Sequence, residues 1–273
     1  MTARYGIIGW PLGHTLSPAL HNWGFGRLGV DARYDAFPLE PGGLPAFLDR
    51  VRTGEILGLS VTIPHKRAVM PLLDRITDRA RRVGAVNTLF RDGDALCGEN
   101  TDVIGVVAPL RRLASLPASA LVLGAGGAAR AAVAGLLELG VADVAVANRT
   151  PDKAAALAVD FGVRAVAWEA RMDEPFGLIC NTTPLGMAGA LEGRSPWDAD
   201  RFPEGCVAYD IVYNPLETRF LREAAAAGCA AVSGLEMFLH QGLAQFRLWT
   251  GRDMDEDGAR RLLLDALAAR PAA

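Results

Sequence analysis

The amino-acid sequence predicts an α/β fold of two domains, each built around a mainly parallel sheet. Short β-branched runs alternate with Ala- and Leu-rich segments of helical length throughout, a pattern typical of βα units. Near the middle, a glycine-rich turn directly follows a strand-like run and opens a helical one. The 273 residues, 51% of them hydrophobic, are enough for two domains with a core each.

The first half begins with a βα unit from Tyr5 to Gly29. Strands are expected at 32–37, at 58–63 and around 88–90, and a helical stretch from Lys66 to Arg82 separates the last two. These elements form the amino-terminal domain.

The second half starts with a helical stretch from Asp102 to Leu113 and continues with a second series of βα units. A helix is expected at 129–139. The segment from Leu235 to Leu267 is expected to be helical, with an apolar stripe that packs back on the first domain. The expected strands of this half are 120–123, 144–147, 163–167, 178–181 and 207–212.

The overall composition excludes several classes of partner. A formal net charge of −3, with Lys and Arg scattered along the chain, argues against nucleic acid. The apolar run from Ala128 to Ala147 is interrupted by charges, and no signal-like segment is seen, so we expect a soluble, cytoplasmic protein without a membrane partner. The cysteines show no CxxC pairing, and we expect reduced, buried thiols without a disulfide framework or a metal site: Cys97, Cys180, Cys206 and Cys229.

The segment ALVLGAGGAARAA has the GxGxxA spacing of a dinucleotide fingerprint at Gly124, Gly126 and Ala129. The first glycine permits a tight turn, the second lets a pyrophosphate approach the backbone, and the alanine lets helix and strand pack closely. Free amides at the helix start attract phosphates. A glycine-rich turn without a ligand is the alternative, but the flanking strand and helix favour a nucleotide.

The end of the next strand indicates which nucleotide is bound. An NAD enzyme usually places an acid there for the ribose hydroxyl, whereas this chain has Asn148, Arg149 and Thr150, followed by Lys153. A guanidinium can pair with a 2′-phosphate, so the residues favour NADP. The alternative is that both cations are ordinary solvated charges.

Two polar motifs before the fingerprint suggest a ligand site. In GHTLSPALHN, the hydroxyls of Thr15 and Ser17 stand at an expected helix start just ahead of Pro18. Ser followed by Pro is a common N-cap and first-turn pair, so Ser17 is interpreted as a helix cap. Hydroxyls beside the free amides of a helix start can also form a binding site for a carboxylate.

In LSVTIPHKRA, Pro64 is expected at the first helical position and Lys66 in the first turn. The positive end of the helix dipole disfavours an ammonium there and brings the amine toward proton transfer. In GENTDVIG, Asp102 starts another helix, where its ionised form is stabilised. The two could pair and exchange a proton with an alcohol while a cofactor exchanges hydride; the alternative is a surface charge and a cap.

The chain resembles the shikimate dehydrogenase family over nearly its whole length. Nine motifs in family order make the resemblance specific: GxPxxHxxSPxxHN, VTIPHK, GAVNT, NTD, GAGGAARA, NRT, NTTPLGM, DIVYNPxxT and GLEMFLHQ. The resemblance implies a substrate domain, residues 1–102 completed by 237–273, and a Rossmann-like NADP domain, residues 103–236, with the active site between them. It further implies reversible reduction of 3-dehydroshikimate to shikimate by NADPH, in aromatic amino acid synthesis through chorismate.

By the same resemblance, Thr15 and Ser17 hold the substrate carboxylate, and Lys66 is the general acid/base assisted by Asp102. The residues expected to contact the ring or its hydroxyls are Thr62, Asn87, Asp102, Tyr213 and Gln241. The residues expected to bind NADP are Gly124, Ala125, Gly126, Gly127 and Ala128 in the phosphate loop, Asn148, Arg149, Thr150 and Lys153 at the adenosine phosphate, Ile211, Gly234 and Met237 at the nicotinamide, and Asp78.

Three residues depart from the family pattern: Thr15 replaces the usual Ser, Ser60 a frequent Asn, and Val103 a frequent Gly. One alternative function is therefore an NAD-dependent quinate/shikimate dehydrogenase, which Thr15 leaves open and Arg149 opposes. Another is a non-catalytic sensor of a ring carboxylate and a nucleotide, which the retained Lys66 opposes. A folate-linked dehydrogenase should lack the paired hydroxyls. The expected partner is a small-molecule substrate, and the protein is expected to be a monomer or homodimer.

Overall fold

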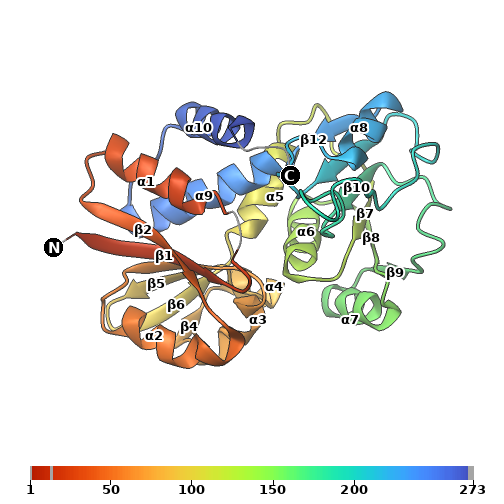
Figure 1. Ribbon diagram of the computed structural model, residues 1–273. Coiled ribbons are helices and arrows are strands. Elements are labelled where there is room, and N and C mark those ends of the chain that lie inside the picture. Colours follow the sequence, from red (N-terminus) through yellow and green to blue (C-terminus); the bar gives the residue numbers. More distant parts are fainter. Residues whose placement is uncertain (1, 13–14, 270–273) are drawn as a thin grey trace. The chain divides into compact units, whose positions relative to one another are not determined.

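The structure, a computed structural model, describes residues 2–12 and 15–269, and they form two compact units (Figure 1). The first unit comprises residues 2–12, 15–101 and 239–269, and the second comprises residues 102–238. Each unit has its own six-stranded sheet, so the α/β prediction is confirmed. In the described part of the chain, no helix is long and apolar enough to cross a membrane.

The first sheet has the strand order β2-β1-β3-β5-β6-β4. Its strands are β1 (Ala3–Gly9), β2 (Ala32–Pro38), β3 (Gly58–Val61), β4 (Arg75–Ile76), β5 (Thr88–Asp92) and β6 (Ala95–Glu99). β1 runs parallel to β2 and β3, but β5 is antiparallel to both β3 and β6. The expectation of a mainly parallel sheet is therefore wrong for this half of the sheet.

Helices cover both faces of this sheet, with α1 (Ser17–Arg27) and α9 (Gly234–Thr250) on one side and α2 (Leu44–Arg52) on the other (Figure 1). On the first face, α1 and α9 contribute aromatic side chains that pack on the strand residue Tyr5: Phe25 and Trp249 lie at ring-centroid distances of 5.2 and 5.5 Å. The other face is aliphatic and packs against α2, which the sequence analysis did not predict.

The stretch from Lys66 to Arg82 is not one continuous helix, so that expectation is wrong. It consists of α3 (His65–Ala68), a 3-10 turn at Met70–Leu72, the strand β4 and α4 (Asp78–Val83). Pro71 lies in the 3-10 turn, and a proline cannot donate the backbone hydrogen bond that a continuing helix needs. The helical segment expected at 235–267 is likewise two helices, α9 and α10 (Glu256–Ala268).

The second sheet is parallel throughout, in the order β12-β11-β10-β7-β8-β9. Its strands are β7 (Ser119–Leu123), β8 (Asp143–Ala147), β9 (Arg164–Val166), β10 (Leu178–Asn181), β11 (Val207–Asp210) and β12 (Ala230–Val232). The chain proceeds outward from β7 on one side and then restarts beside β7 with β10. This is the Rossmann arrangement, in which the switch point beside the first strand favours ligand binding.

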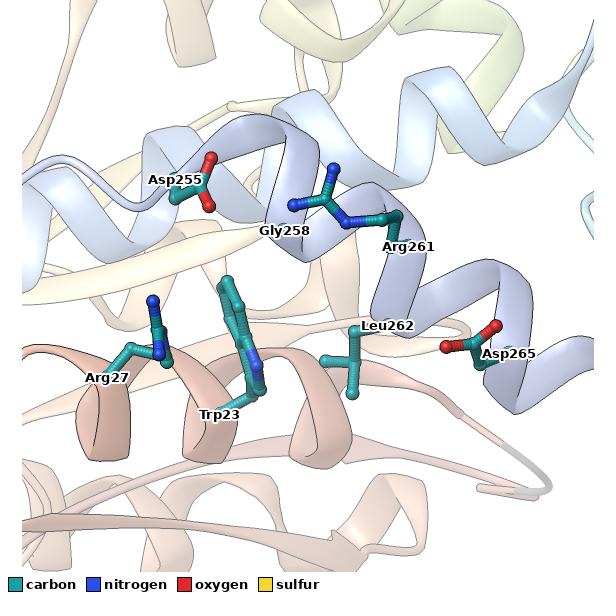
Figure 2. Close-up of a pocket in the computed structure, with 7 residues that line it drawn as sticks. All are labelled: Trp23, Arg27, Asp255, Gly258, Arg261, Leu262 and Asp265. Carbon is teal, nitrogen blue, oxygen red and sulfur yellow. The ribbon is translucent and has the colours of Figure 1, made fainter.

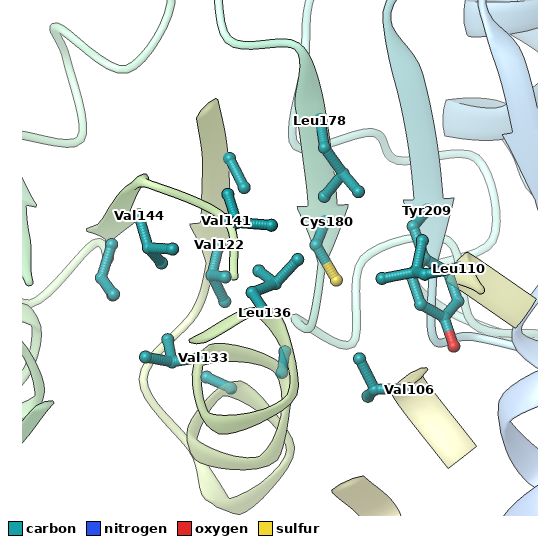
Figure 3. Packing of buried hydrophobic residues seen from close by; sticks show 14 of the residues in the cluster. Val106, Leu110, Val122, Val133, Leu136, Val141, Val144, Leu178, Cys180 and Tyr209 are labelled. Carbon is teal, nitrogen blue, oxygen red and sulfur yellow. The ribbon is translucent and has the colours of Figure 1, made fainter. Parts of the chain in front are cut away.

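One apolar core joins this sheet to the helices on one face (Figure 3). α5 (Asp102–Leu110) contributes Val106 and Leu110, and α6 (Gly127–Glu138) contributes Val133 and Leu136. α7 (Pro151–Phe161) packs into the same core. α8 (Arg219–Ala226) packs into a second core on the opposite face. The core is thus apolar, and the buried polar side chains of Asn181 and Asp210 lie at the carboxyl ends of β10 and β11.

The cysteines of the second unit differ from the sequence expectation. Cys206 and Cys229 form a disulfide, whereas Cys97 and Cys180 are free and buried. The expectation of four reduced thiols is therefore wrong for one pair. The two residues precede β11 and β12, which lie side by side with Val207 opposite Ala230, and that neighbourhood brings the sulfurs together.

Candidate active site

The expected phosphate loop begins where β7 ends. Gly124 has φ of +115° and donates its backbone N–H to the carbonyl oxygen of Ala147 at 2.8 Å. A Cβ added at this position would lie 2.5 Å from Thr182 Oγ1. The turn therefore requires glycine for both its backbone conformation and its contact with the next loop.

The start of α6 leaves room for a ligand. Gly126 is the N-cap, and a Cβ built on it would meet nothing within 4 Å. The backbone amides of Gly127 and Ala128, the first two of the helix, have no partner within the helix and lie at its positive end. Ala129 is fully buried against the sheet. Open space above an N-cap glycine, beside these amides, fits the pyrophosphate of a dinucleotide.

Cationic side chains follow β8. Asn148 is half-buried and donates to the carbonyl oxygen of Thr150 at 2.9 Å, which shapes the turn into α7. Arg149 and Lys153 are exposed, and neither forms an ion pair with a carboxylate of the described residues. With an amide where an NAD enzyme usually has an acid, this turn fits a phosphate on the ribose.

Three residues expected at the nicotinamide end are neighbours in the second unit. A Cβ on Gly234 would lie 2.5 Å from the backbone carbonyl of Ile211, so α9 can begin against the end of β11 only with glycine there. Met237 is buried in the same core that Ile211 borders. The next residue, Phe238, packs on the ring of Tyr213 with centroids 4.7 Å apart.

The paired hydroxyls are in contact at the start of α1. Thr15 Oγ1 accepts from the backbone N–H of Ser17 at 3.2 Å and donates to Ser17 Oγ at 3.1 Å. The helix starts at Ser17 itself and Leu16 is its N-cap, so the interpretation of Ser17 as the cap is wrong. Thr15 instead satisfies the first amide, and both hydroxyls stand together where a helix dipole is positive.

Lys66 is held near Asn87 by the backbone. Thr62 follows β3 and its carbonyl oxygen accepts from His65 N, which closes the turn into α3. Pro64 precedes the helix rather than forming its first residue. The carbonyl oxygen of Lys66 accepts from Val86 N at 2.8 Å, one residue before Asn87. Lys66 is half-buried in the first turn, as its spacing predicts.

Asn87 and Asp102 are linked through Thr101. Asn87 Oδ1 accepts from the backbone N–H of Thr101 at 2.7 Å, and Asn87 Nδ2 donates to Thr101 Oγ1 at 3.0 Å. Asp102 follows directly, is 5% exposed and is the first residue of α5, as expected. Its carboxylate therefore lies at the positive end of a helix.

The last two expected residues differ in environment. Gln241 is 9% exposed on α9. Asp78 begins α4 and is exposed, and its carboxylate pairs with Arg81 one turn later at 2.8 Å. The pair leaves a carboxylate at the surface of the first unit.

A buried polar cluster that the sequence analysis missed lies at the carboxyl ends of β10 and β11. Asp210 is fully buried and accepts hydrogen bonds from Asn181 Nδ2, Val212 N and Thr218 Oγ1. Burial raises the pKa of Asp210 to about 7, although these three donors oppose the shift. Asp210 and Asn181 open the motifs DIVYNP and NTTPLGM, but no pattern in those motifs shows that the two side chains pair.

Two hollows lie apart from all these residues. One, of about 360 Å³, separates α1 from α10 and is lined by Trp23, Arg27 and residues of α10 (Figure 2). The other, of about 380 Å³, lies in the second unit beside Trp197 and Arg219. None of the expected site residues lines either one.

Comparison with known proteins gives matches along the chain. Residues 7–89 match the family model of the shikimate dehydrogenase substrate binding domain. Residues 111–173 match that of shikimate/quinate 5-dehydrogenase, and residues 234–264 match the shikimate 5′-dehydrogenase C-terminal domain.

Similar proteins span the full length. A shikimate dehydrogenase (NADP(+)) of Oleidesulfovibrio alaskensis is 53% identical over 268 residues, which cover 97% of this chain and 96% of that protein. Among solved structures, shikimate 5-dehydrogenase from Thermus thermophilus in complex with NADP(H) and shikimate has a TM-score of 0.88 at 41% identity, covering 97% of this chain and 100% of that one. Quinate dehydrogenase from Corynebacterium glutamicum in complex with NAD has a TM-score of 0.89 at 31% identity, covering 97% and 99%. The chain therefore belongs to the shikimate dehydrogenase family.

Proposed function

We propose that this chain catalyses the reversible, NADP-dependent reduction of 3-dehydroshikimate to shikimate, a step toward chorismate and the aromatic amino acids. The observation that carries the proposal is the turn after β8, where Arg149 and Lys153 are exposed cations without a carboxylate partner among the described residues. The similarity to the shikimate complex from Thermus thermophilus supports the substrate.

Substrate and cofactor bind to different parts of the chain. Residues 1–102, completed by 237–273, bind the substrate, and residues 103–236 bind NADP. The cofactor residues are those of the phosphate loop (Gly124–Ala128), of the turn after β8 (Asn148–Lys153) and of the nicotinamide end, together with Asp78.

The substrate residues act through their hydrogen-bonding groups. Thr15 and Ser17, which meet at the positive end of α1, hold the ring carboxylate. Thr62, Asn87, Asp102, Tyr213 and Gln241 contact the ring and its hydroxyls. The extra methyl of Thr15, compared with a serine, sets how closely the carboxylate end is enclosed.

Lys66 carries the proton. When bound, NADPH supplies the hydride to the ring carbonyl carbon. The Nζ of Lys66 donates a proton to the carbonyl oxygen during reduction and takes it back from the hydroxyl during oxidation. Asp102, the first residue of α5, assists Lys66 in this role.

A two-by-two assay tests this function: NADP+ or NAD+ is offered with shikimate or quinate, and reduction is followed by absorbance. We expect the highest kcat/KM with NADP+ and shikimate. A preference for NAD+ would overturn the assignment of Arg149, and no turnover in any combination would favour a non-catalytic sensor.

The role of Lys66 is tested by Lys66→Ala, with Arg67→Ala as the matched control because Arg67 is the next, exposed cation of α3. General acid/base catalysis contributes about 100- to 10,000-fold to a rate, and we expect kcat to fall within that range in the first variant only. Full turnover by a folded Lys66→Ala protein would contradict the mechanism.

Quinate is the second candidate substrate, for one specific reason. Thr15 presents a methyl group beside the Ser17 hydroxyl, which changes the enclosure where a ring carboxylate and a C1 hydroxyl would sit. Thr15→Ser separates the candidates: if quinate is turned over by the wild type, the smaller side chain should change the ratio of quinate to shikimate turnover.

A further inference from the structure

A continuous series of side-chain hydrogen bonds crosses the interior of the first unit. It joins Tyr34 Oη to Ser60 Oγ at 2.6 Å, Ser60 Oγ to Gln245 Oε1 at 2.9 Å, Gln245 Nε2 to Thr88 Oγ1 at 2.9 Å and Thr88 Oγ1 to Asn87 Oδ1 at 2.8 Å. All five side chains are at most 4% exposed. We call this series the Tyr34–Asn87 chain.

Two main-chain groups fix the orientation of both amides in the Tyr34–Asn87 chain. Gln245 Nε2 also approaches the backbone carbonyl oxygen of Asn87 at 3.3 Å, and a carbonyl can only accept. Asn87 Oδ1 is 2.7 Å from the backbone N–H of Thr101, which can only donate. The nitrogen and oxygen ends of Gln245 and Asn87 are therefore determined.

The fixed amides give the whole series one direction. Gln245 Oε1 must accept, so Ser60 donates to it and in turn accepts from Tyr34, whose pKa is raised by burial and whose hydroxyl therefore keeps its proton. Thr88 accepts from Gln245, and the closer of the two acceptors for its one hydrogen is Asn87 Oδ1 at 2.8 Å, compared with Thr101 Oγ1 at 3.2 Å. The acceptor end of Asn87 is thus occupied by Thr88 and Thr101.

We propose that Gln245 is a positioning residue: through Thr88, and together with the backbone N–H of Thr101, it holds Asn87 as a hydrogen-bond donor toward an oxygen of the substrate ring. This rests on the proposed function, in which Asn87 contacts the ring. Gln245 lies one helical turn after Gln241 on α9, so one helix carries both an expected substrate residue and the group that orients another.

The first test is Gln245→Leu. Without the Nε2 donor, the Thr88 hydroxyl can turn away from Asn87. Asn87 Oδ1 then keeps the backbone N–H of Thr101 but loses the second donor that holds the amide in place. We expect KM for shikimate to rise about tenfold, the equivalent of one neutral hydrogen bond, with KM for NADP+ unchanged. Calorimetric titration of the cofactor-free protein with shikimate should show the same loss.

The matched control is Trp249→Phe. Trp249 also ties α9 to β5, because its Nε1 donates to the carbonyl oxygen of Leu89 at 2.9 Å, two residues after Asn87. We expect this variant to be less stable and to keep its KM for shikimate. An equal rise of KM in both variants would show that Gln245 only docks the helix, and would overturn the proposal.

Substitutions at Thr88 keep the proposal testable even where Gln245→Leu folds poorly. Thr88→Val removes the hydroxyl at nearly constant volume and should raise KM for shikimate as Gln245→Leu does, whereas Thr88→Ser should restore it. The double variant should be no worse than the more affected single variant, because both break one series. Unchanged KM in Thr88→Val, while the wild type turns over shikimate, would refute the positioning role without touching the proposed function.

Discussion

The two units place polar groups in opposite ways. In the first, the Tyr34–Asn87 chain passes through the middle of the fold, between α9 and the sheet, and ends at an expected substrate residue. In the second, the sheet interior is apolar, and buried polar groups such as Asp210 gather at the carboxyl ends of the strands. One expected site therefore depends on side chains that reach deep into the core, and the other on backbone geometry at the carboxyl ends of the strands.

The largest expected effect concerns two buried titratable groups that respond to pH with opposite signs. Burial lowers the pKa of His21 to about 3, only partly offset by the neighbouring Gln245 amide. Below pH 6.5 the unfolded chain binds a proton that the folded one refuses, so stability falls as pH falls toward 3. Asp210, with a pKa near 7 when folded and 3.8 when unfolded, keeps a proton that the unfolded chain loses, so its contribution falls as pH rises from 4 to 7.

Thermal unfolding across pH 4–7 measures both contributions. Each slope has an upper limit of about 1.4 kcal/mol per pH unit. His21→Phe keeps the stacking on Tyr34 and should remove the acid-side loss. Asp210→Asn resembles the protonated acid and should remove the opposite slope. If both variants changed the pH dependence of stability in the same direction, the opposite signs assigned to His21 and Asp210 would be wrong.

A smaller effect is expected from two glycines of one loop. Gly126→Val fills the space above α6 and should raise KM for NADP+ about tenfold or more, with little change in stability because its φ of −88° suits any residue. Gly124→Ala should instead lower stability by about 1–3 kcal/mol. Its φ is +115°, and the added methyl group would lie 2.5 Å from Thr182 Oγ1. Cofactor kinetics and denaturant unfolding of both variants distinguish these roles.

A comparable but more selective effect is expected at Arg149. Arg149→Ala should raise KM for NADP+ about tenfold by removing the pairing with the 2′-phosphate, and leave KM for NAD+ unchanged. The same preparation assayed with the two cofactors is its own control. An equal change for both cofactors would remove the basis for NADP selectivity in this turn.

The smallest effect on KM is expected at Ser60. Ser60→Ala removes the donor to Gln245 Oε1 and leaves the Tyr34 hydroxyl without its acceptor, at a cost of about 1–3 kcal/mol in unfolding free energy. KM for shikimate should change less than in Gln245→Leu, because the main chain still orients the Gln245 amide. A larger change of KM than in Gln245→Leu would mean that Ser60, and not the backbone carbonyl of Asn87, orients the Gln245 amide.

Local patterns predicted the second unit better than the first. The strands at 120–123, 144–147 and 178–181 and the start of α6 follow from β-branched runs and the glycine spacing, because each strand of a parallel sheet is continuously apolar. In the first unit the antiparallel pair β5–β6 was missed, although Gly93 and Asp94 between them are a two-residue hairpin signal.

The expected site residues were found from motifs, but the groups that orient them were not. Gln245 and Thr88 are 157 residues apart, and no spacing in the sequence shows that they share a hydrogen bond. The disulfide was missed for the same reason, since Cys206 and Cys229 meet only because β11 and β12 are neighbours. Such pairings depend on the order of strands in space, which periodicity does not reveal.

The one-way Tyr34–Asn87 chain also restricts which sequences can evolve at its positions. Position 60 needs a side chain that accepts from a phenol and donates to an amide oxygen, so serine, threonine or asparagine suits it, and alanine or valine does not. Position 245 needs both an oxygen and a nitrogen end. We therefore expect these positions to co-vary among relatives, with apolar residues entering at several of them together rather than at one.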